Sequence, residues 1–185
     1  HVVRKIDTLG IISTIAGTGV SGYNGDGPAT SAQLNTPKGV WVDSTGDVFI
    51  ADTGNHLVRK VNVSGMLSTV AGVANTSGTT GDGGAATSAT MTSPNGLFGT
   101  PNGDLYIADW GNHAIRRLIK SSGILSTVAG TLGSSGSTGD GSAAIAATLN
   151  GPFDVFVDSM YNSYIADSNN NKIRKVDAVT GIITT

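Results

Sequence analysis

Short stretches in which apolar and polar residues alternate recur along this chain of 185 residues. In the segment Pro37–Val61 the runs GVWVD and DVFIAD alternate with a period of two, and the turn-forming tripeptide STG separates them. Such alternation, rich in β-branched and aromatic residues, is typical of strands joined by a tight turn. A third run begins at His56 and a fourth is LSTVAG at Leu67–Gly72. The pattern therefore predicts an antiparallel unit of four strands.

The segment occurs three times without a gap, at a period of a little under sixty residues. The copies are PKGVWVDSTGDVFIADTGNHLVRKV at Pro37–Val61, PNGLFGTPNGDLYIADWGNHAIRRL at Pro94–Leu118 and PFDVFVDSMYNSYIADSNNNKIRKV at Pro152–Val176. A fixed internal period indicates a repeat architecture, in which a residue present in every copy serves the repeat first.

The chain opens with strands like the last two of a unit, at His1–Ile6 and Ile11–Gly17. We therefore expect a partial blade at 1–36 and repeats at 37–93, 94–151 and 152–185. Four-stranded units repeated radially predict an all-β fold, a β-propeller with about three and a half blades in this chain. We expect this arc to be part of a longer array or to be completed by another copy.

The recurring proline, VD, IAD and GNHxxRK elements resemble the NHL repeat, and the resemblance covers essentially the whole chain. It implies an NHL-type β-propeller. Several repeat positions vary, so a chemistry that needs any one of them in every blade is excluded. The departures are Asn171 in place of histidine, Gly99 and Thr100 in place of Val42 and Asp43, Asp154 in place of Gly39, and Asn162 in place of Asp47.

Composition agrees with a strand-rich and turn-rich fold. The chain has 27 glycines, only 13% charged residues and no glutamate, a residue that favours helices. A formal net charge of −2 supplies no general attraction for nucleic acid or an anionic membrane. There is no cysteine for a disulfide or thiolate metal site, and no apolar run of transmembrane length.

Three histidines, His1, His56 and His113, stand at one repeat position. The resemblance extends to amidating lyases, which use an NHL-like propeller and bind zinc through histidines. Equivalent residues of successive blades lie about a blade width apart, however, and a zinc ion needs nitrogens at roughly 2.0–2.1 Å. We expect each histidine to bridge strands within its own blade.

Arg-Lys or Arg-Arg pairs hold most of the basic residues, and NHL propellers of the tripartite-motif kind bind RNA on a basic face. Neighbours along a strand point to opposite sides, so the two members of a pair cannot join one patch. An aspartate stands seven residues before each arginine, which predicts one buried or half-buried ion pair per blade. The predicted pairs are Asp52 with Arg59, Asp109 with Arg116, and Asp167 with Arg174.

Each loop after a fourth strand carries a GDG tripeptide, with Asp26, Asp82 or Asp140 at its centre. These carboxylates are weak calcium candidates, because one carboxylate per loop falls far short of the six to eight oxygens that calcium takes. The favoured interpretation is an aspartate that caps the short Ala-rich turn that follows.

Aromatic residues recur at Trp41 and its equivalents, and at Phe49 and its equivalents, which predicts packing between blades. Trp110 differs, because the other copies carry Thr53 and Ser168 there, and it is a possible contact residue. Asn62 and Asn75 lie in N-x-S/T acceptor patterns for glycosylation.

We therefore expect a non-enzymatic structural or interaction scaffold, self-assembling through open blade edges into a closed ring or an extracellular fibre. The alternatives are a fragment of an NHL-type lyase or hydrolase, and a carbohydrate- or protein-binding propeller that uses Trp110. Expected partners are further copies or repeats, and glycans, with no nucleic acid, cofactor or membrane insertion. The expected location is extracellular or at the cell surface.

Overall fold

The computed structural model describes all 185 residues and consists of strands, short 3-10 turns and loops, which confirms the all-β class. The strands are β1 (Val3–Ile6), β2 (Ile12–Ala16), β3 (Gly27–Pro28), β4 (Pro37–Val42), β5 (Val48–Asp52), β6 (Leu57–Val61), β7 (Met66–Ala71), β8 (Gly84–Ala85), β9 (Pro94–Gly99), β10 (Leu105–Asp109), β11 (Ala114–Ile119), β12 (Ile124–Ala129), β13 (Pro152–Val157), β14 (Ser163–Asp167), β15 (Lys172–Val176) and β16 (Ile183–Thr184). The 3-10 turns are η1 (Ala29–Ser31), η2 (Thr53–Asn55), η3 (Ala86–Ser88), η4 (Trp110–Asn112), η5 (Ala144–Ala146) and η6 (Ser168–Asn170).

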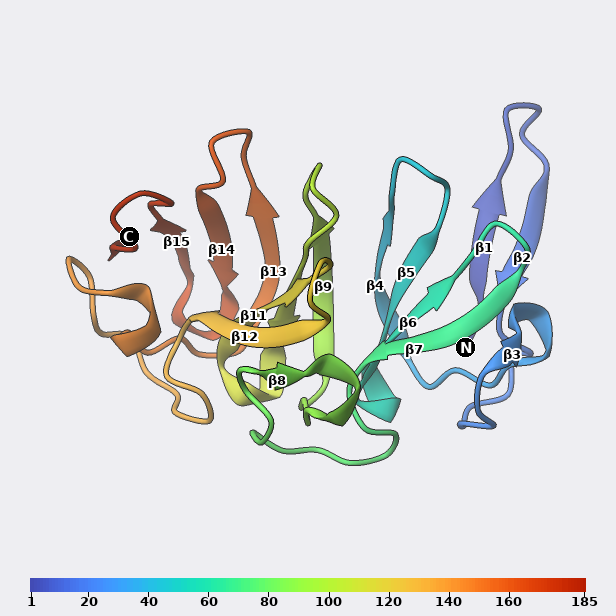
Figure 1. Ribbon diagram of the computed structural model, residues 1–185, viewed down its shortest axis with the longest axis horizontal. Helices are drawn as coiled ribbons and strands as arrows, with labels where there is room; N and C mark the ends of the chain where they lie inside the picture. Colours follow the sequence, from blue (N-terminus) through green and yellow to red (C-terminus); the bar gives the residue numbers. More distant parts are fainter.

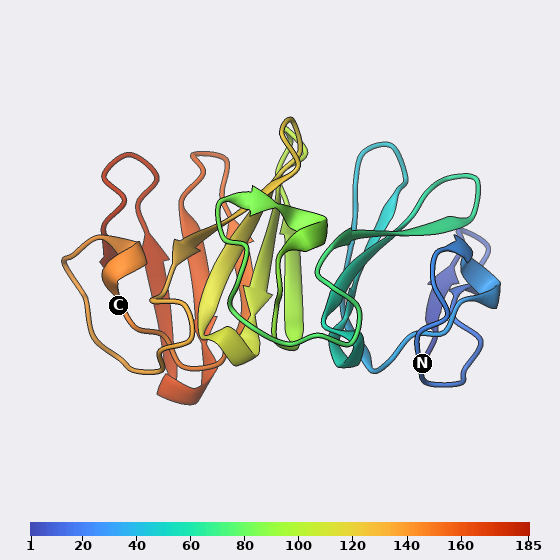
Figure 2. The same cartoon turned by 60° about the horizontal axis from the view of Figure 1, so that its bottom comes forward.

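Four antiparallel sheets stand side by side in an open arc (Figure 1). We call them the first blade (β1–β2), the second blade (β3-β7-β6-β5-β4), the third blade (β8-β12-β11-β10-β9) and the fourth blade (β13-β14-β15-β16). The strands β4, β9 and β13 lie next to one another and form the inner edge of the arc. The view in Figure 2 shows the blades succeeding one another in chain order.

The second and third blades have five strands, one more than the sequence pattern predicts. The extra strands, β3 and β8, come from the GDG loops and pair with the outermost strands, β7 and β12. Each loop thus returns along the outside of the blade that follows it. This pairing covers a strand edge that would otherwise present unpaired backbone groups.

The hydrophobic core lies between blades. One cluster joins Ala51, Val58 and Ala71 of the second blade to Leu97 and Ile107 of the third. Another joins the third and fourth blades, where the rings of Phe98 and Phe156 meet with centroids 4.8 Å apart. The alternating apolar positions of each strand are therefore divided between the two neighbours of its blade.

The inner strands approach each other closely. A Cβ atom added at Gly39 would lie 2.1 Å from the backbone oxygen of Asn95, so β4 and β9 can be this close only because residue 39 has no side chain. In the fourth blade Asp154 occupies the equivalent position. Its side chain is exposed, and its carboxylate lies beside Gly96 of the third blade.

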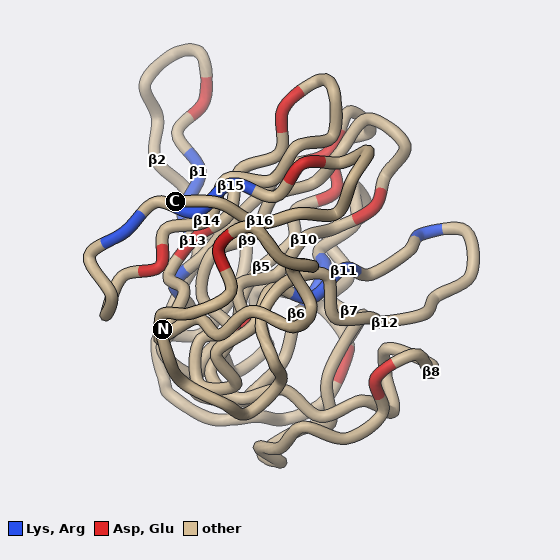
Figure 3. The backbone as a smooth tube through the Cα atoms, turned by 90° about the vertical axis from the view of Figure 1, so that its left-hand side faces the viewer, with Lys and Arg blue, Asp and Glu red and all other residues tan.

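Basic and acidic residues are spread over several strands and turns along the backbone (Figure 3). No helix in the structure has the length and apolar character needed to cross a membrane.

Candidate functional site

The aspartate of each IAD element lies at the centre of a buried network. In the third blade, Asp109 Oδ1 accepts a hydrogen bond from the Thr92 backbone N–H at 2.8 Å. Its Oδ2 accepts from Asn112 Nδ2 at 2.8 Å and from Arg116 Nη1 at 3.3 Å. Asp109 and Arg116 are both fully buried. The Asn of the NHL motif thus orients the aspartate, which in turn holds the arginine.

The second and fourth blades repeat this network. Asp52 accepts from Asn55 Nδ2 at 2.8 Å and pairs with Arg59 at 3.5 Å. Asp167 accepts from Asn170 Nδ2 at 2.8 Å and pairs with Arg174 at 3.6 Å. All three ion pairs that the spacing of seven residues predicts are present in the structure.

Each arginine has a second carboxylate partner, which the GDG loop supplies. Asp26 pairs with Arg59 at 3.0 Å, Asp82 with Arg116 at 2.9 Å and Asp140 with Arg174 at 2.8 Å. These aspartates also accept hydrogen bonds from Thr69, Thr127 and Thr185 in or beside the fourth strand of each blade.

None of these loop aspartates caps the Ala-rich turn, so the capping interpretation was wrong. The N-cap residues of η1, η3 and η5 are Pro28, Ala85 and Ala143, and none makes a side-chain cap hydrogen bond. The loop carboxylate instead compensates the charge of the buried arginine, a role that the loop sequence alone does not indicate. The structure contains no group of three or more His, Asp or Glu side chains placed to hold a metal ion.

Burial has the largest influence on the pKa of the buried aspartates. It raises the pKa of Asp109 to about 6, although hydrogen bonds from Thr92, Asn112 and Arg116 act in the opposite direction. Burial likewise raises the pKa of Asp52. These carboxylates therefore depend on their donors to remain ionised beside the arginine.

The histidines connect successive repeats, whereas the sequence led us to expect a bridge within one blade. His56 Nδ1 accepts from the Ser93 backbone N–H at 3.0 Å, and His113 Nδ1 accepts from the Gly151 N–H at 3.0 Å. His1 makes the same bond to Thr36. Each acceptor therefore holds the residue that enters the inner strand of the next blade.

These histidines adopt the left-handed backbone conformation, with φ of 60° at His56 and 55° at His113. Asn171 takes φ of 53° at the same position of the fourth blade. Asparagine tolerates this conformation better than most residues. The substitution of histidine by asparagine therefore preserves the backbone turn.

Trp110, the possible contact residue, is 38% exposed at the start of η4. The Lys38 ammonium lies 6.0 Å from the centroid of its ring and 5.8 Å from that of Phe153. Three blades thus contribute to one small exposed cluster. Asn75, one of the two glycosylation acceptors, is exposed, and the side-chain oxygen of the other, Asn62, accepts from Ser64 and Met66 in a turn.

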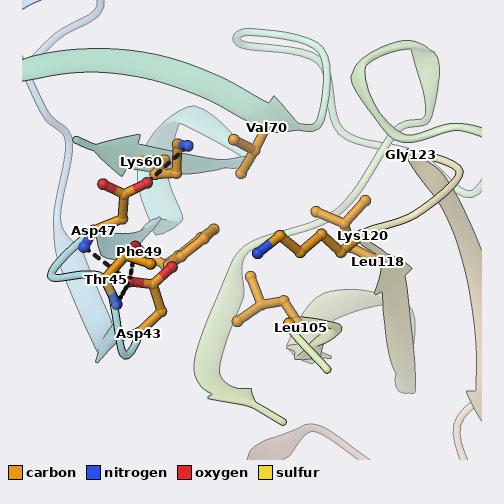
Figure 4. Close-up of a pocket in the computed structure, with 11 residues that line it drawn as sticks. Asp43, Thr45, Asp47, Phe49, Lys60, Val70, Leu105, Leu118, Lys120 and Gly123 are labelled. Atoms are coloured by element: carbon orange, nitrogen blue, oxygen red, sulfur yellow. Dashed lines mark hydrogen bonds and ion pairs between the residues drawn. The ribbon is translucent and has the colours of Figure 1, made fainter. Parts of the chain in front are cut away.

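A cleft at the turn ends of the inner strands brings together residues that differ between repeats. It has a volume of about 510 Å³, and Trp41, Asp43, Phe98, Thr100 and Lys120 are among the residues that line it. An adjoining pocket of about 290 Å³ shares Asp43, Gly103 and Lys120 with it (Figure 4). The local sequence pattern does not indicate this site, although Gly99 and Thr100 in it are departures from the repeat.

The side of the fourth blade that faces away from the arc is apolar. Ile173 is 62% exposed there, whereas the equivalent Val58 and Ile115 are fully buried against the next blade. Phe156, which is 54% exposed, is equivalent to Phe98, which packs on the fourth blade. A shallow groove of about 210 Å³ runs between these residues.

The blade topology and the repeated Asp-Asn-His-Arg network define the class of protein as an NHL-type β-propeller. A family model described as the Teneurin NHL domain matches residues 21–80. The chain is 33% identical over 105 residues to Teneurin-1 of Mus musculus and 33% identical over 111 residues to Teneurin-4 of Homo sapiens. These alignments cover 50% and 54% of this chain but only 4% of each relative.

Solved structures agree on the fold. A protein of unknown function from Bacteroides thetaiotaomicron has a TM-score of 0.69 and 24% identity, over 91% of this chain and 40% of that chain. An auxiliary nutrient binding protein from the same species has a TM-score of 0.68 at 22% identity, over 93% and 42% of the two chains. A streptogramin B lyase has a TM-score of 0.62 at 15% identity, over 97% and 45%.

The chain is therefore an NHL-repeat protein and forms a β-propeller segment. It spans less than half the length of these solved structures. At such low identity the likeness to them shows the fold alone.

Proposed function

We propose that this chain is a non-enzymatic interaction scaffold whose blade flanks associate with further NHL blades, including those of a second copy. One observation carries the proposal. The fourth blade exposes Phe156 and Ile173 on the same side with which the second and third blades bind their successors.

The polar residues of the repeat support a scaffold role. The Asp109–Arg116 pair and its equivalents are buried, and each arginine is paired with one aspartate of its blade and one of the neighbouring loop. The Nδ1 atoms of the histidines accept hydrogen bonds from backbone N–H groups of the next repeat. These residues therefore stabilise the blades and the junctions between them.

At the opposite end of the arc the first blade has only two strands, and it leaves part of the second blade uncovered. Val40 and Val42 on the inner strand of the second blade are exposed, whereas their equivalents Val155 and Val157 are buried against the third blade. A contact between the fourth blade of one copy and the first and second blades of another would be heterologous. Such contacts close into a ring or propagate as a fibre, depending on the rotation between copies.

Size-exclusion chromatography with light scattering over a range of protein concentrations tests the proposal. We expect the chain to self-associate and the Ile173→Asp variant to remain monomeric, because a charge on the flank is costly to bury. Val179→Asp is the matched control, since Val179 is exposed in the turn that follows β15. Electron microscopy of the associated material then distinguishes rings from fibres.

A wild-type chain that stays monomeric at every concentration would contradict self-association. Equal association of the Ile173→Asp and wild-type chains would exclude this flank as the contact. A catalytic activity lost on mutation of Asp52 or His56 in a correctly folded variant would contradict the non-enzymatic role.

We also propose an extracellular or cell-surface location. The exposed Asn75 and the turn residue Asn62 support it, because both acceptor sequences are on the surface of the blades. The chain should be glycosylated when a eukaryotic host secretes it. Glycosidase treatment should then lower its apparent mass. Removal of both acceptors by Asn→Gln substitution should abolish the shift, and an unmodified secreted chain would contradict this part of the proposal.

A further inference from the structure

The cleft at the turn ends of the inner strands, which the second, third and fourth blades line, includes residues that depart from the repeat. Trp41 stands where the other copies have Phe98 and Phe156. Gly99 stands where they have Val42 and Val157. Trp41, Gly99 and Lys120 thus combine with the repeat aspartates Asp43 and Asp158 in one cleft, and departures from a regular repeat point to a requirement beyond blade packing.

Gly99 and Trp41 form the floor of the cleft together. A Cβ atom added at Gly99 would lie 2.2 Å from the Trp41 ring, so the indole occupies the space that the valine side chain takes in the other blades. The indole ring also packs beside Phe49, with centroids 5.5 Å apart. Trp41 is therefore held by its neighbours and remains half-exposed at the cleft.

The rim of the cleft carries polar groups of both kinds. Asp43 Oδ1 accepts from the Thr45 hydroxyl and from the backbone N–H groups of Thr45 and Asp47, which leaves Oδ2 facing the cleft without a partner from the protein. Burial raises the pKa of Asp43, but these hydrogen bonds, together with the Lys120 charge, lower it below its ordinary value. The carboxylate is therefore ionised and able to accept further hydrogen bonds.

Lys120 supplies the opposite charge. Its side chain lies across Gly103, and Figure 4 shows the ammonium extending into the space in front of Phe49 and Asp43. Lys60 and Arg117, the other cations near this end of the blades, are paired with Asp47 and Asp104. The Lys120 ammonium forms no ion pair. The equivalent positions of the other repeats are Val63 and Ala178, so this ammonium occurs once in the arc.

From this geometry we infer that the cleft binds a neutral oligosaccharide, with a sugar ring stacked on Trp41 and its hydroxyls bound by Asp43 and Lys120. An aromatic face receives the C–H face of a pyranose, while a carboxylate and an ammonium accept from and donate to its hydroxyls. The volume of about 510 Å³ lies within the usual range of small-molecule sites. Asp158 also lines the cleft, so two carboxylates oppose an anionic ligand. This site does not depend on blade association.

The two tryptophans of the chain allow a direct test. In the Trp110→Thr variant, which adopts the residue of the second blade, Trp41 is the single tryptophan. We would titrate this variant with cellohexaose, mannohexaose and chitohexaose and follow indole emission. At least one of the three is expected to produce a saturable change, and calorimetry with the wild-type chain should give the same affinity.

Asp43→Asn and Lys120→Ala should each weaken that affinity about tenfold or more, because each removes a charged hydrogen-bonding partner. Lys175→Ala in the fourth blade is the matched control and should bind normally. Thermal unfolding of each variant verifies that it is folded. The inference is overturned if none of the three sugars produces a saturable change, or if binding survives unaltered in both Asp43→Asn and Lys120→Ala.

Discussion

Arg116 shows how a single residue determines the interior of a blade. Its guanidinium is fully buried between Asp109, which is also buried, and Asp82, whose side chain is 40% exposed. A buried ion is tolerated only where its charge is compensated and its donors are engaged. Asp109 therefore contributes more to the stability of the fold than Asp82, although both carboxylates lie at similar distances from the Arg116 guanidinium.

Replacement of Asp109 by alanine should lower the free energy of unfolding by about 3–5 kcal/mol, because it leaves a buried arginine with one partner. Asp82→Ala removes only the exposed partner, so we expect a loss of about 1 kcal/mol or less. Urea denaturation of the two variants measures both values. Similar losses would show that the burial of the aspartate is not what makes the pair important.

The acid sensitivity of the fold can be predicted from Asp104. Burial raises the pKa of Asp104, but hydrogen bonds from Arg117, the Lys120 backbone and Asn102 lower it by more. The pKa is therefore below the ordinary value of 3.8. A carboxyl whose pKa is lower in the folded state stabilises the fold fully above its unfolded pKa. This stabilisation is lost as the pH falls through the folded pKa.

We therefore expect Asp104→Asn to destabilise the chain by about 2 kcal/mol at pH 7, the usual scale for charged hydrogen bonds. The difference between variant and wild type should shrink below pH 4. Denaturation curves at pH 7, 4 and 3 measure it. A difference that is the same at all three values would contradict the assigned shift.

Individual contacts could be predicted from the sequence where both partners recur at a fixed spacing. Asp52 and Arg59 stand seven residues apart in adjacent strands, so their pairing follows from hairpin geometry. The contact of His56 with Ser93 spans 37 residues and depends on how successive blades dock. No local pattern contains that information, and the expected bridge within one blade was wrong for this reason.

At the scale of elements, the turn after each IAD strand joins neighbouring blades. The η2 and η4 turns end on a left-handed histidine, and that histidine accepts a hydrogen bond from the entry to the next inner strand. One element thus determines both the path of its own hairpin and the start of the following repeat.

The variant His113→Asn introduces the residue of the fourth blade into this turn and keeps the left-handed backbone accessible. It removes the Nδ1 acceptor of the Gly151 N–H, so we expect a loss of about 1 kcal/mol. His113→Val should cost more, because a β-branched residue strains the positive φ. Thermal unfolding ranks the two, and a valine variant as stable as the asparagine variant would contradict the backbone argument.

The strands that alternate strongly were predictable as elements, whereas β3 and β8 were not. Each has only two residues, and Gly84–Ala85 carries no alternation that a pattern could reveal. Their pairing with β7 and β12 arises from the return of a long loop along the blade edge. The cleft at Trp41 was equally hidden, since it requires the turn ends of three blades to be placed side by side.

The whole molecule is a row of blades. The place of a blade in the row determines how much hydrophobic core it shares with its neighbours. The third blade contributes to both large clusters, with Leu97 and Ile107 in one and Tyr106 and Ile115 in the other. The first blade has two strands only, and Ile6, Ile11 and Ile12 are exposed on it. In repeat proteins stability is approximately a sum of such neighbour interactions.

Native-state hydrogen exchange should therefore be graded along the chain. We expect the amides of β1 and β2 to exchange fastest and those of β10 and β11 slowest, because opening the third blade exposes core on both sides. Exchange measured in the monomeric Ile173→Asp variant separates this gradient from protection by self-association. Equal protection in all four blades would mean that the arc unfolds as one cooperative unit. Protection that is lowest in the third blade would contradict the prediction. It would mean that the junctions between blades, which the histidines hold, determine the order of opening.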